Sequence, residues 1–474
     1  MIFSLKEACG IVGIYGHPEA ANLAYLCLYA LQHRGQESAG IVSSNGRMMY
    51  SHRAMGLVQE VFNREILLQL KGHTAIGHTR YSTIGQSLLK NCQPFAIDST
   101  RGRLALAHNG NLVNSQELRK ELEDRGAIFQ STVDTEIIAH LMASVHSDAL
   151  AERITAALAR VRGAFSLVFL SDHQLAAARD PWGFRPLVLG RLKDAYVIAS
   201  ETCALDLIEA RFEREVEPGE IIIIDDNGVQ SFKPFSPQAS AFCVFEHIYF
   251  ARPDSHIFGQ NVHQVRLRLG EKLARLHPVD ADMVISVPDS GRSASLGYAR
   301  GSGLLYEDGL VRNHYVGRTF IEPSQSIRHF GVKIKLNAVR SVLEGKRVVV
   351  VDDSIVRGTT CKKIVSMLRE LGGAKEVHMR ISSPPVSHPC FYGVDTPTRG
   401  ELAYNEMNED IEKIRGFLGA DTLGYLTISA VREAVADSRS SYCEACFTGD
   451  YPVEFPEALR EKQMNLFLQE IEKR

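Results

Sequence analysis

A cysteine near the start of the 474-residue chain stands where it could act as a nucleophile. Cys9 comes directly before the short apolar run "GIVGIY". If Met1 to Ala8 are removed, the new α-amine, with a pKa of about 7.7 to 8.0, can serve as general base for the thiol beside it. Packing, metal binding and disulfide formation are the other roles open to this cysteine.

Three motifs downstream contain the polar groups that acyl transfer at such a thiol requires. In "LALAHNGNLVN", the Asn109 amide and the Gly110 backbone N–H can both donate to an oxyanion. Arg80 in "GHTRYSTIG" suits a substrate carboxylate, and Asp134 in "VDTEIIAHLM" suits a substrate ammonium group. Taken singly, a hairpin turn for Asn-Gly, a surface charge for Arg80 and a helix cap for Asp134 are commoner interpretations.

A second chemical motif is the segment "RVVVVDDSIVRGTT", in which Asp352 and Asp353 follow four valines of an expected buried strand. Ionised carboxylates only accept hydrogen bonds, so the pair suits a sugar diol or a hydrated Mg2+. Gly358 lets the backbone approach a ligand, and Thr359 and Thr360 begin a helix, where a phosphate is favoured. The plain alternative, a strand end and a helix cap, is disfavoured because acids after a buried strand are costly without a partner.

Two kinds of secondary-structure pattern must position these residues. Up to about residue 230, closely spaced short strands with few helices predict packed antiparallel sheets, with Asn114 and Glu117 capping a helix that follows. After "FKPFSPQAS", the expected linker, continuous β-branched runs alternate with amphipathic helices. That alternation predicts an α/β domain with a parallel sheet covered on both faces. The pattern of the C-terminal 18 residues predicts a charged surface helix.

Composition narrows the class of protein. Lys+Arg 53 against Asp+Glu 56 gives a net charge of −3, so there is no basic field for nucleic acid and small-molecule partners are expected. No apolar run is long enough to cross a bilayer, and the first residues lack the features of a secretion signal. Nine cysteines, an odd number, do not suggest a disulfide framework. We therefore expect a cytoplasmic protein that does not bind a membrane.

The acid-ended strand resembles the phosphoribosyl-diphosphate (PRPP) motif of the phosphoribosyltransferases. The resemblance implies that the loop from Asp352 and Asp353 to Thr360 binds PRPP, with the 5-phosphate held by Ser354, Ile355, Val356, Arg357, Gly358, Thr359 and Thr360. "VISVPDSGRSAS" looks like the pyrophosphate loop of the same family, which implies that Ser290 lies near a Mg2+ ion shared with the acid pair.

Together with "ACGIVG" and "LQHRGQESAG", the motifs of the first half look like the glutaminase domain of amidotransferases with an N-terminal nucleophile. The resemblance implies an α+β fold, a four-layer αββα sandwich, with Cys9 as nucleophile. Asn109 and Gly110 would form the oxyanion hole, and Arg80 and Asp134 would bind glutamine. Members of the wider group begin directly after the initiator Met, so residues 1–8 would here be a propeptide.

A glutaminase followed by a PRPP-binding domain is similar to the glutamine PRPP amidotransferases, from Cys9 through Phe447. This resemblance implies residues 1–8 as propeptide, 9–232 as glutaminase and 233–474 as phosphoribosyltransferase. It implies transfer of ammonia from glutamine to PRPP, which gives 5-phosphoribosylamine, glutamate and pyrophosphate in the first committed step of purine synthesis. It also implies feedback by purine nucleotides and a homo-oligomer, usually a tetramer or dimer.

The stretch 318–337, with Arg328, Lys333 and Lys335, is either the family's flexible loop over the diphosphate or an ordinary basic surface loop. Two rivals remain: a hexosamine-phosphate synthase, which shares the glutaminase half, and a PRPP-sensing regulator without turnover. The acid-ended strand opposes the first, and the complete set of glutaminase residues opposes the second.

Four further cysteines form a possible ligand set. Cys443 and Cys446 make a C-x-x-C pair, and Cys243 and Cys390 complete four. Four thiolates can bind a 4Fe–4S cluster or Zn2+, and spacing does not decide between them. Resemblance to the iron–sulfur subgroup of the family favours a structural 4Fe–4S cluster. The remaining positions, Cys27, Cys92, Cys203 and Cys361, suit buried free thiols.

Overall fold

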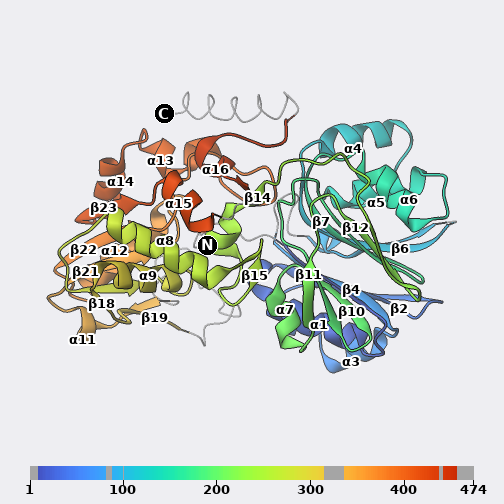
Figure 1. Cartoon of the computed structure of the whole chain (residues 1–474), viewed down its shortest axis with the longest axis horizontal. Coiled ribbons are helices and arrows are strands. Elements are labelled where there is room, and N and C mark those ends of the chain that lie inside the picture. Colours follow the sequence, from blue (N-terminus) through green and yellow to red (C-terminus); the bar gives the residue numbers. More distant parts are fainter. Residues whose placement is uncertain (1–8, 82–87, 100, 314–335, 437–440, 456–474) are drawn as a thin grey trace.

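The computed structural model describes residues 9–81, 88–99, 101–313, 336–436 and 441–455, which form two lobes side by side (Figure 1). The expected C-terminal helix, the loop residues Arg328, Lys333 and Lys335, and the leader lie outside the described residues. Among the helices that are described, none is both long and apolar enough to cross a bilayer.

The first lobe contains two antiparallel sheets, as the strand pattern predicts. The seven-stranded sheet has the order β11-β9-β10-β1-β4-β2-β3, and the six-stranded sheet has the order β13-β12-β8-β7-β6-β5. The strands of the first are β1 Gly10–Tyr15, β2 Ser38–Ser44, β3 Met49–Met55, β4 Thr74–Arg80, β9 Val188–Leu192, β10 Ala195–Ala199 and β11 Arg211–Glu215. Those of the second are β5 Phe95–Ser99, β6 Gly102–Leu112, β7 Gly163–Ser171, β8 Leu175–Arg179, β12 Ile221–Asp225 and β13 Gly228–Phe232.

Helices cover the outer face of each sheet. One apolar core lies between the two sheets, around Ile11 and Val168. A second core lies between the seven-stranded sheet and its helices, and a third lies between the six-stranded sheet and its helices. This arrangement confirms the four-layer αββα sandwich. The helices on the seven-stranded sheet are α1 Ala20–Ala30, α2 Val58–Val61, α3 Arg64–Gln69 and α7 Thr202–Leu207; those on the other are α4 Ser115–Asp124, α5 Thr135–Ser144 and α6 Leu150–Leu158.

One local expectation is wrong. Helix α4 begins at Ser115 as predicted, but the Asn114 side chain does not cap it. Its Nδ2 donates to the Arg160 carbonyl at 3.0 Å, and its Oδ1 accepts the Arg162 N–H at 2.9 Å. The side chain joins β7 to α4 instead, because the chain entering β7 presents backbone groups that need partners.

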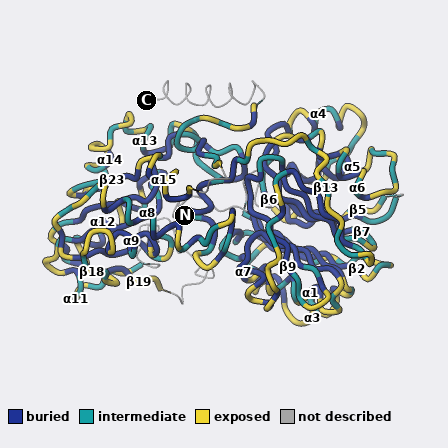
Figure 2. Tube along the Cα trace, in the orientation of Figure 1, coloured by how far each residue is buried: buried dark blue, intermediate teal, exposed yellow. Residues whose placement is uncertain are grey.

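The second lobe is built on a five-stranded parallel sheet, which confirms the α/β expectation. Valines of β21 alternate between two cores, Val349 and Val351 in one and Val348 and Val350 in the other, so both faces are buried (Figure 2). The strands are β17 Met283–Ser286, β18 Leu305–Tyr306, β21 Arg347–Asp352, β22 Glu376–Ile381 and β23 Thr422–Tyr425. Helices α8 Val262–Leu276, α9 Arg292–Ser302 and α15 Ile428–Val435 cover one face, and α12 Thr359–Glu370 and α14 Ile411–Leu418 cover the other.

The order of this sheet, β18-β17-β21-β22-β23, has a consequence for ligands. The chain moves from β17 to β18 on one side, while β21 lies on the other side of β17. Open parallel sheets bind ligands at the carboxyl ends of the strands where the order reverses. Here that position lies between the loops that follow β17 and β21.

Between the lobes, the described residues 233–241 form no helix or strand, as expected of a linker. Strand β14 then pairs in parallel with β24 near the end of the chain. The smaller elements are β14 Phe242–Cys243, β15 His256–Ile257, β16 Gln260–Asn261, β19 Leu310–Arg312, β20 Leu336–Ala338, β24 Tyr442–Cys443, the π-helical turn η3 Glu246–Phe250, the short 3-10 turns η1 Gln32–Arg34, η2 Leu89–Asn91 and η5 Arg399–Glu401, and helices α11 Arg340–Leu343, α13 Ala403–Glu406 and α16 Ala445–Thr448.

Candidate functional site

Cys9 lies at the entrance of β1, next to the end of β4. Its thiol is buried and donates to the Tyr81 carbonyl, with 3.5 Å from sulfur to oxygen. Burial raises the pKa of the Cys9 thiol, while the positive charges of Arg80 and Arg34 act in the opposite direction. A thiol in this setting needs a base close by before it can attack.

Arg80 and Asp134 lie near this thiol, since the charges of both act on its pKa. Arg80 is the last residue of β4 and only 2% exposed, so it is no surface charge. The Asp134 side chain does not cap α5; its Oδ2 accepts the Leu112 N–H at 2.9 Å. Although burial favours the neutral acid, His108 and this hydrogen bond lower the pKa of Asp134, so the group stays an anion.

Asn109 and Gly110 lie inside strand β6, paired with β7, and not in a hairpin turn. The Asn109 side chain is fully buried, yet neither its nitrogen nor its oxygen has a hydrogen-bond partner among the described residues. Gly110 has φ +150°, and a Cβ there would meet the Ala164 carbonyl oxygen at 2.1 Å. A buried amide without a partner costs about 1–3 kcal/mol, which is explained if a ligand supplies the partner.

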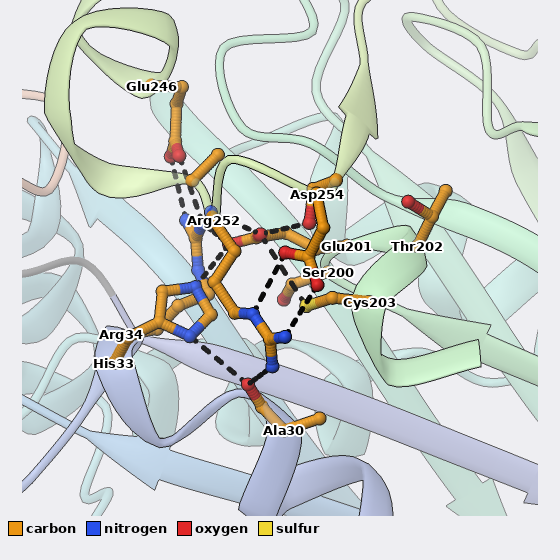
Figure 3. A network of polar contacts seen from close by, with 12 residues as sticks. Ala30, His33, Arg34, Ser200, Glu201, Thr202, Cys203, Glu246, Arg252 and Asp254 are labelled. Atoms are coloured by element: carbon orange, nitrogen blue, oxygen red, sulfur yellow. Dashed lines mark hydrogen bonds and ion pairs between the residues drawn. The ribbon is translucent and has the colours of Figure 1, made fainter. Parts of the chain in front are cut away.

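Arg34 was not singled out from the sequence, although it lies in the quoted segment "LQHRGQESAG". Its Nε donates to the Cys9 carbonyl at 3.0 Å, and its two terminal nitrogens donate to Glu246 of the second lobe at 2.9 and 2.7 Å. Both side chains are completely buried. Figure 3 shows the guanidinium between Glu246 and Glu201. One arginine thus connects the backbone of Cys9 to the first residue of η3.

Glu201 adds a second link between the lobes (Figure 3). Its Oε1 accepts from Arg34 at 2.5 Å and from His33 Nε2 at 2.8 Å, and its Oε2 accepts from the Ser255 hydroxyl and the Arg252 N–H. Burial would raise the pKa of Glu201, but the charges of His33 and Arg34 hold it well below its usual value. The buried ion pair of Arg34 and Glu201 therefore stays charged and hydrogen-bonded.

We expect Glu246→Gln to lower Tm by roughly 5–15 °C, because breaking a buried ion pair costs about 3–5 kcal/mol. The change leaves Arg34 and Arg185 with one buried carboxylate fewer, since Arg185 Nη1 also donates to Glu246 at 3.1 Å. Thermal unfolding measures the effect. The matched control is Glu344→Gln, whose partner Arg340 and own side chain are exposed, and which should leave Tm nearly unchanged. Equal Tm values for both variants would contradict this assignment.

The second candidate site lies at the carboxyl end of β21. Asp352 and Asp353 are both buried, and the Asp353 N–H donates to Asp352 Oδ1 at 3.0 Å. Burial, and the charge of the neighbouring acid, raise the pKa of Asp352, and burial raises that of Asp353. Two carboxylates in this position favour a bound cation, which would remove the cost of burying their charge.

Two loops meet at this acid pair, as the strand order requires. The Ser290 hydroxyl, in the loop after β17, and Ser354 both stabilise the Asp353 carboxylate by hydrogen bonds, and Ser354 Oγ lies 2.6 Å from Oδ1. Gly358, with φ +72°, precedes α12, and no side chain caps that helix. The first-turn N–H groups of α12, at Thr359 and Thr360, can therefore bind an anion.

The other residues of the predicted phosphate loop differ in role. Ile355 and Val356 are buried in the apolar cores, so only their backbone groups can reach a ligand. Arg357 donates to Glu401 at 2.7 Å. Cys361, predicted as a buried free thiol, is buried and donates to Asp352 Oδ2 at 3.5 Å. This thiol thus orients one of the two acids.

The four remaining candidate cysteines line one small cavity of about 30 Å³. Cys243 and Cys443 face each other across the β14–β24 pair, and the Tyr392 N–H donates to the Cys390 sulfur at 3.3 Å. Burial raises the pKa of Cys243 to about 11, and the pKa of Cys446 is raised by burial and by the three other thiols. In the described part of the chain, no three side chains are already disposed as metal ligands.

Comparisons with known proteins cover nearly the whole chain. A family model described as "Glutamine amidotransferase domain" matches residues 78–207. The chain is 54% identical to the chloroplastic amidophosphoribosyltransferase of Glycine max, over 97% of this chain and 81% of the relative. It is 50% identical to the amidophosphoribosyltransferase of Bacillus subtilis, over 96% of each.

Two solved structures are similar to this chain over nearly its whole length. The structure described as "the allosteric regulatory enzyme of purine biosynthesis" superposes with a TM-score of 0.90 at 49% identity, covering 94% of this chain and 97% of the other. The glutamine PRPP amidotransferase of Bacillus subtilis, complexed with ADP and GMP, superposes with a TM-score of 0.89 at 49% identity, covering 94% and 98%.

Proposed function

The chain belongs to the amidophosphoribosyltransferase family, and from that premise we propose which of its residues carry each half of the reaction. The enzyme transfers nitrogen from glutamine to PRPP, giving 5-phosphoribosylamine, glutamate and pyrophosphate, the first step of purine biosynthesis. One observation carries the assignment of residues. A buried thiol and an asparagine without a partner among the described residues lie in one lobe, and an acid pair at a strand-order reversal lies in the other.

In the glutaminase half, Cys9 attacks the side-chain amide of glutamine, and its own α-amine takes the thiol proton. The free amine requires removal of residues 1–8. The Asn109 amide and the Gly110 N–H bind the oxyanion, which supplies the partner that Asn109 lacks. Arg80 binds the α-carboxylate of glutamine and Asp134 its ammonium group, and the lowered pKa of Asp134 keeps that acid charged.

In the phosphoribosyltransferase half, the residues after β21 bind PRPP. The loop 354–360 and the first turn of α12 hold the 5-phosphate, and Asp352 and Asp353 bind the ribose hydroxyls or the metal. Ser290, Asp352 and Asp353 would hold Mg2+, and their oxygen donors and buried charge fit that ion. When bound, Mg2+ neutralises the charge that develops on departing pyrophosphate.

The ammonia released by Cys9 must reach the ribose without being protonated by water, because the ammonium ion is no nucleophile. Close contacts between the lobes support a dry passage. Asn111 donates to the Phe391 carbonyl at 2.8 Å, and the rings of Phe184 and Tyr392 stack 4.3 Å apart. We propose that the segment 318–337 closes the passage over bound PRPP; its residues 318–335 lie outside the described part.

We propose a 4Fe–4S cluster on Cys243, Cys390, Cys443 and Cys446. Four sulfur donors around one cavity fit such a cluster, and a backbone N–H to a ligand sulfur is a typical way to tune one. The cluster would join the start of the second domain to the C-terminal segment. Domain boundaries at 8/9 and 232/233 follow from the same assignment, and β13 ends at Phe232.

Regulation, assembly and location are further proposals. One similar enzyme binds ADP and GMP, so we propose that purine nucleotides inhibit this chain by feedback. A homotetramer and a cytoplasmic location are proposed from the sequence resemblance and the cysteine usage. The Glycine max relative is named chloroplastic, so the compartment differs among relatives.

Intact-mass spectrometry with iron and sulfide analysis tests two of these proposals on one sample. For protein purified without oxygen, we expect a chain that begins at Cys9 and about four iron and four sulfide per chain. Cys446→Ser should lose most of the iron, whereas Cys27→Ser, which changes a buried thiol outside the set, should keep it. Zinc in place of iron would contradict the cluster, and active protein that begins at Met1 would contradict the proposed base.

A further inference from the structure

The second half of β6 extends past its neighbour and leaves one edge without a strand. Strand β5 pairs only with the first half of β6. Farther along this edge, the His108 N–H donates to Gln93 Oε1 at 2.8 Å, and the Leu112 N–H donates to Asp134 Oδ2 at 2.9 Å. Alternate N–H groups of a strand point to the same side. The Gly110 N–H therefore lies between these two on the open edge, where a ligand can accept from it.

The second lobe contacts β6 at this point. A Cβ built on Gly393 would lie 2.9 Å from the carbonyl carbon of Gly110, 3.0 Å from its Cα and 3.1 Å from its carbonyl oxygen. The next residue of β6, Asn111, donates from Nδ2 to the Phe391 carbonyl at 2.8 Å. The loop 390–394 therefore contacts β6 at the proposed oxyanion residue and at the residue that follows it.

Both sides of Gly110 are tightly packed. On the side of β7, a Cβ built on Gly110 would lie 2.1 Å from a carbonyl oxygen of that strand. On the other side, the loop is held before and after Gly393. Arg185 donates twice to the Tyr392 carbonyl, at 3.1 and 2.8 Å, and Val394 is buried in a core of the second lobe. A side chain at position 393 would therefore push on the Gly110 backbone.

We propose that Gly393 is a positioning residue for glutamine hydrolysis. The bare backbone of this glycine, at φ +102°, lies directly against Gly110 and keeps the Gly110 N–H where the oxyanion forms. The second lobe thus completes the glutaminase site of the first. The proposal rests on the assignment of Gly110 to the oxyanion hole and adds a residue from the other lobe to that site.

Gly393→Ala tests this role. At saturating PRPP, the variant should release glutamate from glutamine with a kcat lowered by roughly 10- to 100-fold, because a shift of about 1 Å at a reacting group has an effect of that size. The KM for glutamine should stay close to the wild-type value, since Arg80 and Asp134 are not displaced. Pyrophosphate release with added ammonia should also be unchanged. Partial unfolding would lower both rates together.

Two further variants accompany it. Gly345→Ala is the matched control, because Gly345 also has a positive φ, of +70°, but no atom lies within 4 Å of a Cβ built on it. This variant should keep both rates. Asn111→Ala removes the hydrogen bond to Phe391 without adding atoms, and it should lower glutamate release by about 2- to 10-fold while the rate with ammonia persists.

Each contrary outcome has a separate meaning. An equal loss with glutamine and with ammonia in Gly393→Ala means a packing role and overturns the proposal. Loss of phosphoribosylamine with unchanged glutamate release assigns the contact to the passage of ammonia, which also overturns it. If Gly393→Ala does not fold, wild-type glutamate release by Asn111→Ala overturns it.

The proposed function itself is tested on the same assay with Cys9→Ala. If that variant still releases glutamate, the nucleophile is wrongly assigned and the role of Gly393 fails with it. If Cys9→Ala releases none and Gly393→Ala releases glutamate at the wild-type rate, the role of Gly393 alone is overturned.

Discussion

Replacing Cys9 with Ala should abolish glutamine-dependent formation of phosphoribosylamine, by about 10⁴-fold or more, while activity with added ammonia persists. The thiol is the proposed nucleophile of the first lobe, whereas PRPP is bound in the second. Added ammonia needs no nucleophile in the first lobe. The measurement is the rate of pyrophosphate release with each nitrogen source at saturating PRPP.

Two controls sharpen this experiment. A Cys9→Ala chain produced without residues 1–8 separates loss of the thiol from failure to remove the leader. Cys27→Ala removes another buried thiol, one that donates to the Ala204 carbonyl outside the site, and it should keep both activities. If added ammonia does not restore synthesis to the Cys9 variant, the two lobes do not divide the reaction as proposed.

Replacing Asp352 or Asp353 with Asn should reduce synthesis with both nitrogen sources, by roughly 10²–10³-fold. The amide removes the negative charge that binds the metal and accepts from the ribose. Both nitrogen sources depend on the same bound PRPP, so neither can rescue the variants. Steady-state rates with glutamine and with ammonia measure the loss.

The matched control lies at the other end of the same strand. Asp280→Asn changes an exposed acid that pairs with Arg347, the first residue of β21, and it should leave both rates near the wild-type value. Full activity of Asp352→Asn and Asp353→Asn with both nitrogen sources would remove the acid pair from the site. A loss with glutamine alone would place the pair in the passage of ammonia.

The sequence alone determined the local features of this protein. A run of buried valines with acids directly after it is a property of consecutive residues, so the sequence predicted β21 and the acid pair at its end without coordinates. The same holds for α12 and for the run that forms β1 after Cys9. Alternation and helical periodicity arise within one element, because each residue's direction follows from the backbone repeat.

Only the tertiary structure decided which of these elements meet. The position of β17 next to β21, which brings Ser290 to Asp353, depends on how the sheet assembles and not on any one segment. Pairing with β7 excluded the hairpin turn for Asn109, and burial excluded the surface charge for Arg80; neither is contained in a sequence pattern.

The same reason explains what sequence reasoning missed. Arg34 and Glu246 belong to different lobes, and a polar side chain chooses its partner from whatever folding brings within reach. For that reason Asn114 bonds to the chain entering β7 and not to its own helix, and the Asn109 amide has no partner among the described residues. Local patterns specify elements, whereas long-range packing specifies which buried polar groups are paired and which are left for ligands.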